Sequence, residues 1–229
     1  MTEDMIVVGV IGQKGGGGKT TTSLGLAVAA AEDGKTVAVI DIDQQANAAK
    51  WRDRRPHNNV AVIGALQSRI KHTVETARAH GADYVIIDSP GHNDTAAMET
   101  VRAADLVLLP IEAQMFHLET LPAMRDLVRV AGDKPTWIFI NKLHPAAFVQ
   151  AEKLKAIVAQ TYGMRVCSVH WSRLDVYATA ADVGLTPLEQ VRDGRAADEV
   201  RSLYRFTISE IQKSRSSDHV ESRLATTGA

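Results

Sequence analysis

A glycine-rich segment near the start of the chain constrains its fold more than any other feature. Residues 14–20 read K-G-G-G-G-K-T. Consecutive glycines let the backbone curl until several N–H groups point at one anion, and the start of a following helix adds partial positive charge. Lys19 then suits the β- and γ-phosphates of a nucleotide, and the Thr20 hydroxyl suits Mg²⁺. The segment therefore predicts a phosphate-binding loop.

The flanking sequence supplies the strand and the helix that such a loop requires. Residues 5–11 form an apolar run, M-I-V-V-G-V-I, which is typical of a buried strand. After Thr20, an apolar stripe from Leu24 to Ala31 predicts a helix, and Gly34 is placed to end it. The order of strand, glycine loop and helix is the context in which this motif binds phosphate.

Short apolar runs followed by a polar or turn residue recur along the chain. They cover residues 37–40, 84–87, 106–109 and 137–140, with a further strand expected at 165–169. Helical patterns lie between and after them, at residues 69–80, 95–104, 118–131, 148–162 and 196–213. This alternation predicts a doubly wound α/β fold, in which a mostly parallel sheet carries helices on both faces. Functional residues are then expected at the carboxyl ends of the strands.

Length and composition are consistent with one domain of this type. The chain has 229 residues, 45% of them hydrophobic, and we expect a single domain at 1–213 with a flexible tail at 214–229. A formal net charge of −1 gives no global positive field for nucleic acid. The only cysteine, Cys167, excludes an internal disulfide and fits a reducing cytosol. No apolar run approaches the ~20 residues of a membrane helix, so we expect a cytoplasmic protein without membrane attachment.

Three aspartates follow two of the expected strands. Asp88 ends the run at 84–87, where a carboxylate could hold Mg²⁺ directly or through water. A helix N-cap is the alternative for this position, but the phosphate loop in the same chain favours the metal. Asp41 and Asp43 lie two residues apart, hence on the same side if the strand continues through Ile42. One of them could brace the loop or the metal while the other positions or activates water.

These motifs resemble the ParA/MinD family of deviant Walker ATPases, and most of all the short ParA partition proteins similar to ParF. The resemblance is carried by a fixed set of residues in the family's order: Lys14, Lys19, Thr20, Asp41, Asp43 and Asp88. Trp51 and residues 173–177 strengthen it, and it covers residues 5–213. Gln44 stands where the family usually has proline, so the local turn is expected to differ. Because the loop lies so close to Met1, we expect no N-terminal DNA-binding extension of the kind that longer ParA proteins carry.

The resemblance implies a homodimer that depends on ATP and Mg²⁺. In this family two ATP-bound subunits meet face to face, and the signature lysine, here Lys14, reaches the partner's phosphates. A cation delivered in this way stabilises the charge that develops during phosphoryl transfer. By position, the catalytic residues would be Lys14, Lys19 and Asp43, with Asp43 orienting the attacking water. The residues expected at Mg²⁺ are Thr20, Asp41 and Asp88. Those expected at the nucleotide are Lys14, Gly15, Gly16, Gly17, Gly18, Lys19, Thr20, Thr21 and Asn141, where Asn141 either reads adenine or caps its strand.

The resemblance further implies a partition ATPase. Such a dimer binds DNA nonspecifically in its ATP state, associates with the nucleoid, and segregates or positions plasmid, chromosome or other cargo. A ParB-like partner stimulates its ATP hydrolysis. Arg173 stands where relatives place a cation for DNA, and Arg195 and Arg201 lie in a C-terminal region that is rich in cations. Because acids are interspersed there, an ordinary solvated helix face fits that region equally well.

Other classes remain as alternatives. A conjugal-transfer-type or regulatory DNA-binding ATPase would share every motif described above. A MinD-like membrane-cycling ATPase would need an apolar face near the C-terminus, which residues 216–222 (S-S-D-H-V-E-S) do not offer. An iron–sulfur reductase on the same scaffold is disfavoured, because a cluster shared between subunits needs a pair of cysteines from each chain.

Overall fold

The computed structural model describes residues 5–13, 15–113 and 119–227. Its strands are β1 (Ile6–Val10), β2 (Val37–Asp41), β3 (Ala61–Gly64), β4 (Tyr84–Asp88), β5 (Leu106–Glu112), β6 (Thr136–Leu143) and β7 (Arg165–Ser172). Its α-helices are α1 (Lys19–Glu32), α2 (Asn47–Arg54), α3 (Ile70–Ala79), α4 (Asp94–Ala103), α6 (Leu121–Val130), α7 (Phe148–Tyr162), α8 (Val176–Asp182), α9 (Pro187–Gln190) and α10 (Arg195–Thr227).

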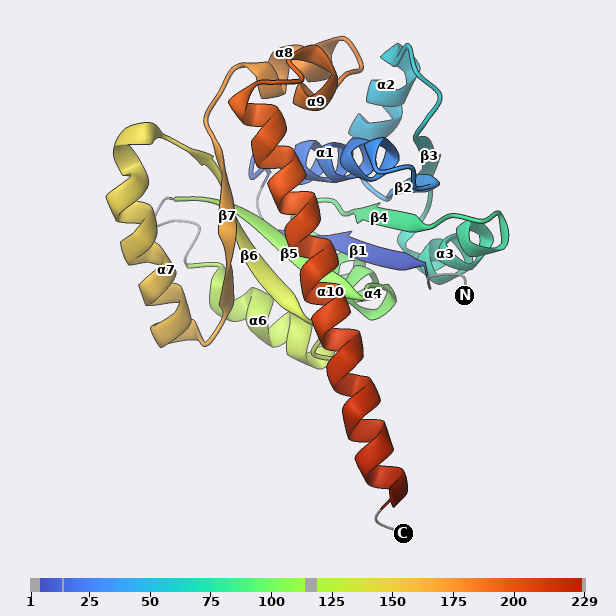
Figure 1. Ribbon diagram of the computed structural model, residues 1–229, viewed down its shortest axis with the longest axis vertical. Helices are drawn as coiled ribbons and strands as arrows, with labels where there is room; N and C mark the ends of the chain where they lie inside the picture. The colour runs from blue at the N-terminus through green and yellow to red at the C-terminus, as the bar shows by residue number, and fades with distance from the viewer. Residues whose placement is uncertain (1–4, 14, 114–118, 228–229) are drawn as a thin grey trace.

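The strands form one sheet in the order β3-β2-β4-β1-β5-β6-β7. Every neighbouring pair is parallel, which confirms the predicted doubly wound fold. All residues of β2 and β4 are buried, which explains why both are apolar up to their final aspartates. The register places Asp88 opposite both Val10 and Asp41, so the first three strand ends meet at one edge of the sheet. This edge carries the glycine loop (Figure 1).

Helices pack against both faces of the sheet, and alternate residues of the central strands point to opposite faces. Val8 and Val10 belong to an apolar cluster that includes residues of α1, α2 and α10. Val7 belongs to a second cluster with residues of α3 and α4, and Val107 to a third with residues of α4, α6 and α7. The core is therefore split by the sheet, with α1 and the long α10 together on one side.

The structure confirms the predicted strands and adds elements that the sequence did not indicate. β5, β6 and β7 continue beyond the apolar runs to Glu112, Leu143 and Ser172, because pairing between these strands persists there. β3 was not predicted, since it has four residues, lies at the sheet edge and is only partly buried. The short helices α2, α8 and α9 were also missed. The helix expected at 118–131 begins at Leu121, and residue 118 lies outside the described part of the chain.

The expected end of the last helix at Lys213 is wrong. α10 continues to Thr227, so the backbone of residues 214–227 is helical where a frayed tail was expected. Residues 214–227 contain neither glycine nor proline, the two residues that most oppose a helical backbone. Arg215 donates to Met5 O at 3.1 Å, which ties this part of α10 to the start of β1. The last turns of α10 project beyond the rest of the molecule (Figure 1).

Candidate functional site

The glycine loop joins β1 directly to the N-terminus of α1. Gly16 and Gly18 have φ angles of +86° and +87°, in the left-handed region that glycine adopts without strain. Gly18 is the N-cap of α1, and its carbonyl accepts the first helical bond from Thr22 N at 2.8 Å. The N-terminus of α1, whose first N–H groups lack acceptors within the helix, therefore lies at the end of the glycine loop, as phosphate binding requires. Lys14, the predicted signature lysine, lies outside the described residues.

Residues at the ends of β5 and β6 hold the loop in place. Asn141 Nδ2 donates to Gly17 O at 3.0 Å, while Asn141 Oδ1 accepts from Lys142 N at 2.8 Å. The Lys142 ammonium donates to Gly16 O and pairs with Glu112 at 3.0 Å. Asn141 thus lies beneath the loop and braces it. Sequence reasoning missed Lys142, although an Asn-Lys pair directly after an apolar strand was a usable signal.

Lys19 is buried at the mouth of the loop. Its exposed fraction is 8%, and burial lowers the pKa of its ammonium, while the charges of Asp88 and Asp43 partly oppose this shift. The structure therefore places Lys19 within electrostatic reach of two of the three predicted aspartates. A buried ammonium of this kind is poised to be compensated by the phosphate charge of a ligand.

Asp88 ends β4 beside α1 and is almost completely buried, with an exposed fraction of 1%. Its Oδ1 accepts from Ser23 Oγ at 3.0 Å, but Oδ2 has no hydrogen-bond partner within the described residues. Burial raises the pKa of Asp88 to about 7, which the hydroxyls of Thr20 and Ser23 and the charge of Lys19 moderate. An unpartnered buried carboxylate oxygen near the Thr20 hydroxyl fits a metal ion or its bound water.

Asp41 braces the segment that follows β2. Its Oδ1 accepts from Asp43 N at 3.1 Å, and its Oδ2 accepts from Ala48 N at 3.0 Å and Ala49 N at 3.2 Å. These bonds satisfy the first N–H groups of α2 and lower the pKa of Asp41, although burial has the larger effect and raises it. The carboxylate therefore braces the segment between β2 and α2, and these three bonds do not reach the glycine loop.

Asp43 does not continue the strand. β2 ends at Asp41, so the strand does not continue through Ile42 and the condition for both side chains to project from one strand is not met. The segment turns instead: Asp43 Oδ1 accepts from Gln45 N at 2.9 Å, and Asp43 O accepts from Ala46 N at 2.9 Å. Ala46 has a left-handed φ of 50°. The turn leaves Asp43 half-exposed. Its carboxylate is close enough to Lys19 to oppose the lowering of the Lys19 pKa that burial causes.

A buried ion pair joins α2 to α9. Arg55 Nη2 lies 2.6 Å from Glu189 Oε1, and the Arg55 side chain is fully buried. The guanidinium also lies over the Trp51 ring, 4.5 Å from its centre, and Trp51 Nε1 donates to Leu185 O at 3.0 Å. The segment that follows Asp41 and Asp43 is thus anchored at the C-terminal end of α2.

Glu199 on α10 holds the end of β7. Its carboxylate accepts from Ser172 N at 2.8 Å, Ser172 Oγ at 2.6 Å, Tyr177 OH at 3.1 Å and Arg195 Nε at 2.9 Å. The same contact raises the pKa of Tyr177, after burial as the main cause. Sequence reasoning missed Glu199, because an acid within an exposed-looking helix gives no sign of partners on a distant strand.

The residues predicted for DNA differ in availability. Arg173 follows β7 and is exposed, and its N–H donates to Leu143 O at 2.9 Å. Arg195 pairs with Glu199, as described above. Arg201 pairs with Glu32 at 3.3 Å and with Asp198 at 3.5 Å. Two of the three predicted cations are therefore already paired with carboxylates.

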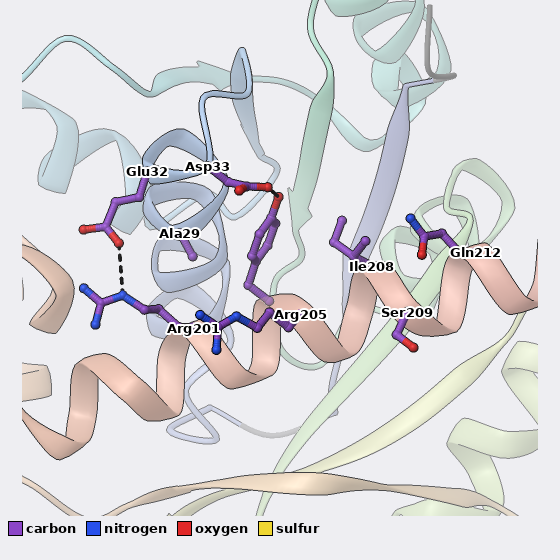
Figure 2. A pocket seen from close by; sticks show the side chains of 9 residues that line it. Ala29, Glu32, Asp33, Arg201, Arg205, Ile208, Ser209 and Gln212 are labelled. Carbon is purple, nitrogen blue, oxygen red and sulfur yellow. Dashed lines mark hydrogen bonds and ion pairs between the residues drawn. The ribbon is translucent and has the colours of Figure 1, made fainter. Parts of the chain in front are cut away.

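Arg201 lies in a groove of about 370 Å³ between the end of α1 and α10, which Figure 2 shows from close by. In this view Arg201 points toward Glu32, while Tyr204 OH donates to Asp33 at 2.8 Å. Each side of the groove thus carries charges that the other side compensates. This arrangement stabilises the packing of α10 on α1 and leaves little net charge for an external anion.

The described residues contain neither a preformed metal-binding cluster nor a membrane-spanning helix. No three His, Cys, Asp or Glu residues gather there in a way that could hold a metal ion by themselves. A metal ion at Asp88 would therefore need oxygen ligands from a nucleotide or water, as is usual for Mg²⁺. In the same part of the chain, no helix is both long enough and apolar enough to cross a membrane.

Comparison with known proteins places these features in a family. Residues 8–216 match the family model described as the CobQ/CobB/MinD/ParA nucleotide binding domain. Protein virC1 of Rhizobium rhizogenes is 31% identical over 103 residues, which cover 42% of this chain and 45% of that protein, less than half its length. The chromosome-partitioning ATPase Soj of Thermus thermophilus is 25% identical over 241 residues, covering 90% of this chain and 96% of Soj.

A solved structure supports the fold. The septum site-determining protein MinD of Pyrococcus horikoshii, complexed with Mg-ADP, aligns with a TM-score of 0.68 and 17% sequence identity. The alignment covers 87% of this chain and 94% of that one. At this level of identity the likeness concerns the arrangement of strands and helices alone.

Proposed function

Because the chain belongs to the CobQ/CobB/MinD/ParA nucleotide-binding family, we propose that it is a partition-type ATPase that binds and hydrolyses ATP with Mg²⁺. One observation carries the proposal: the N-terminus of α1, which follows the glycine loop, lies beside buried Lys19 and a buried Asp88 whose Oδ2 has no partner within the described residues. A magnesium nucleotide would bring phosphate charge to the helix N-terminus and Lys19, and a cation to Asp88.

The described residues divide the work of binding and hydrolysis. The N–H groups of Gly15 to Gly18 and the ammonium of Lys19 hold the phosphates, with Thr21 on the first turn of α1 and Asn141 beneath the loop completing the nucleotide site. Thr20 and Asp88 hold Mg²⁺, which when bound neutralises charge on the β- and γ-phosphates. Asp41 supports this site through the bonds that it makes to Asp43 N and to the start of α2. Half-exposed Asp43 orients the attacking water.

The proposal extends to an ATP-dependent homodimer. Lys14 of each subunit supplies positive charge to the partner's nucleotide, so that dimer formation reports the presence of ATP. The dimer binds DNA nonspecifically and segregates or positions cargo from the nucleoid, and a ParB-like partner stimulates its hydrolysis. The family and the similarity to the partition ATPase Soj support this function. Exposed Arg173 is a DNA contact in this proposal, whereas the ion pairs of Arg195 and Arg201 weaken the case for those residues.

One experiment tests these steps together. Sedimentation and DNA mobility are measured without nucleotide, with ADP and with ATP for the wild type, Asp43→Ala and Lys14→Gln. We expect the wild type to dimerise and bind DNA only with ATP. Asp43→Ala should keep the dimer while phosphate release stops, and Lys14→Gln should lose the dimer while each subunit still binds ATP. A wild type that stays monomeric and free of DNA under all three conditions would refute the partition function.

A further inference from the structure

α2 carries cations that no carboxylate compensates. Lys50 and Arg54 lie one turn apart on this helix and are exposed, and Arg52 lies between them. Within the described residues, none of the three forms an ion pair. Arg52 donates instead to Asn58 Oδ1 at 2.8 Å and Arg54 to Ala181 O at 3.2 Å, and both acceptors are uncharged. Asp53 is the one acid in this helix, so α2 presents an excess of positive charge.

The cations of α10 offer a direct contrast. Arg195, Arg201, Lys213 and Arg215 each lie within 4 Å of a carboxylate oxygen, namely in Glu199, Glu32, Glu210 and Asp105. An external phosphate would have to compete with these carboxylates. On α2 it would meet cations whose charge is unopposed. These four cations of α10 are therefore less available to an external phosphate than Lys50 and Arg54, whereas Arg205 of the same helix is exposed and forms no ion pair within the described residues.

Lys50 and Arg54 also line a pocket of about 310 Å³ between α1, α2, α8 and α9. Its wall includes the side chains of Thr20 and Thr21 from the first turn of α1 and Tyr177 from α8. No aspartate or glutamate lines it among the described residues. α2 and α8 lie at the same end of the molecule (Figure 1). This end thus carries the unpaired cations Lys50 and Arg54 beside the pocket.

We propose that this surface, formed by Lys50 and Arg54 of α2, binds the phosphate backbone of duplex DNA. The proposal rests on the proposed partition function and assigns its DNA contacts to residues. Duplex DNA fits because the surface offers two exposed cations one turn apart whose charge is unopposed, as nonspecific contact with phosphates requires. It also fits a chain whose net charge of −1 gives no general attraction to DNA.

The surface is connected to the nucleotide site by bonds. Asp41 Oδ2 holds Ala48 N and Ala49 N, which immediately precede Lys50, and Asp41 Oδ1 holds Asp43 N. At the other end, the Arg55–Glu189 pair fixes α2 to α9. A shift of Asp43 toward the nucleotide therefore moves the N-terminal turn of α2 and its cations. DNA affinity would in this way depend on the nucleotide that is bound.

The test compares matched pairs of charge removals. Binding of a 60-base-pair duplex is measured by fluorescence anisotropy with ATP at several salt concentrations, for Lys50→Gln/Arg54→Gln and for the control Arg201→Gln/Lys213→Gln. Each phosphate contact contributes about 0.9 to the salt slope, so the first variant should lose about 1.8 per chain. Raising the salt from 50 to 200 mM should therefore reduce the affinity of this variant by a factor about tenfold smaller than for the wild type, for each chain that contacts DNA. The control should keep the wild-type slope. Lys50→Arg/Arg54→Lys, which conserves charge, should bind as the wild type does and excludes a folding defect.

The outcomes separate the two proposals. A wild type that binds no duplex with any nucleotide overturns the partition function together with the surface. If the wild type binds the duplex but the Lys50→Gln/Arg54→Gln variant keeps the wild-type salt slope, the result overturns this surface alone. The same holds if only the α10 control loses affinity. In both of these cases the cations of α2 would serve another anion, such as an acidic segment of a protein.

Discussion

Alanine substitutions in the glycine loop separate two costs that its geometry imposes. Gly16 and Gly18 both have left-handed φ angles, so either substitution strains the backbone by about 1–2 kcal/mol. At Gly16 the new Cβ meets no described atom within 4 Å, whereas at Gly18 it collides with Asn141 Nδ2. Asn141 must then move and give up its bonds to Gly17 O and Lys142 N. Each bond contributes about 1 kcal/mol, so the expected loss of unfolding free energy is about 1–2 kcal/mol for Gly16→Ala and about 3–4 kcal/mol for Gly18→Ala.

Urea unfolding without nucleotide, followed by circular dichroism, measures both values. Gly15→Ala is the matched control, because Gly15 lacks a left-handed φ and its Cβ would have no described atom within 4 Å. Its stability should stay within about 0.5 kcal/mol of the wild type. The variant Gly18→Ala/Asn141→Ala removes the obstacle, so its loss should be about 1–2 kcal/mol smaller than the sum of the single losses. Equal costs at Gly16 and Gly18, or strict additivity in the double variant, would refute the bracing role of Asn141.

Three further predictions concern charged residues of the site and its supports. Asp43→Ala is expected to lower ATP turnover by about 100-fold or more while ATP still binds, since it removes the group that orients water; phosphate release and nucleotide titration measure the two effects. Folding raises the pKa of Asp88 from 3.8 to about 7, so between these pH values the folded state holds a proton that the unfolded chain releases. The free energy of unfolding therefore falls as the pH rises from about 4 to about 7, and Asp88→Asn should flatten the pH dependence of the urea midpoint in this range. Arg55→Met leaves Glu189 buried without its cation and should cost about 3–5 kcal/mol in urea unfolding, whereas Arg102→Met, which removes an exposed pair, should cost less than about 1 kcal/mol.

The sequence indicated the central elements because their signals are local. A buried parallel strand needs apolar side chains on both faces, and a phosphate loop needs glycines in a row, so β1, β2, β4 and the loop were all recognisable. β3 and α2 were missed for a physical reason: each is short, and each depends on contacts made elsewhere. α2 begins where Asp41 accepts the N–H groups of Ala48 and Ala49, and local propensity does not reveal a cap that lies seven residues upstream.

Residues that position others were hardest to foresee. Lys142 and Asn141 shape the loop through its carbonyl groups, and Glu199 holds the end of β7 from 27 residues away. Each contact depends on which strands are neighbours and on their register. A single sequence of this type shows that strands are present, but it does not show that β5 and β6 end beneath the glycine loop. The side chains at those ends become part of the site only through the topology.

Asp41 and Asp88 show how far environment, not residue type, decides a role. They are register partners at the ends of β2 and β4, and the sequence offers no basis for telling them apart. Burial raises the pKa of Asp41, and the three backbone N–H bonds that it accepts offset part of this rise while they hold the segment after β2 and the start of α2. Asp88 interacts with the hydroxyls of Thr20 and Ser23 but keeps an unpartnered oxygen within the described residues, and burial raises its pKa to about 7. A cation that reaches Asp88 favours its ionised form, so ligand binding and charge are coupled at Asp88.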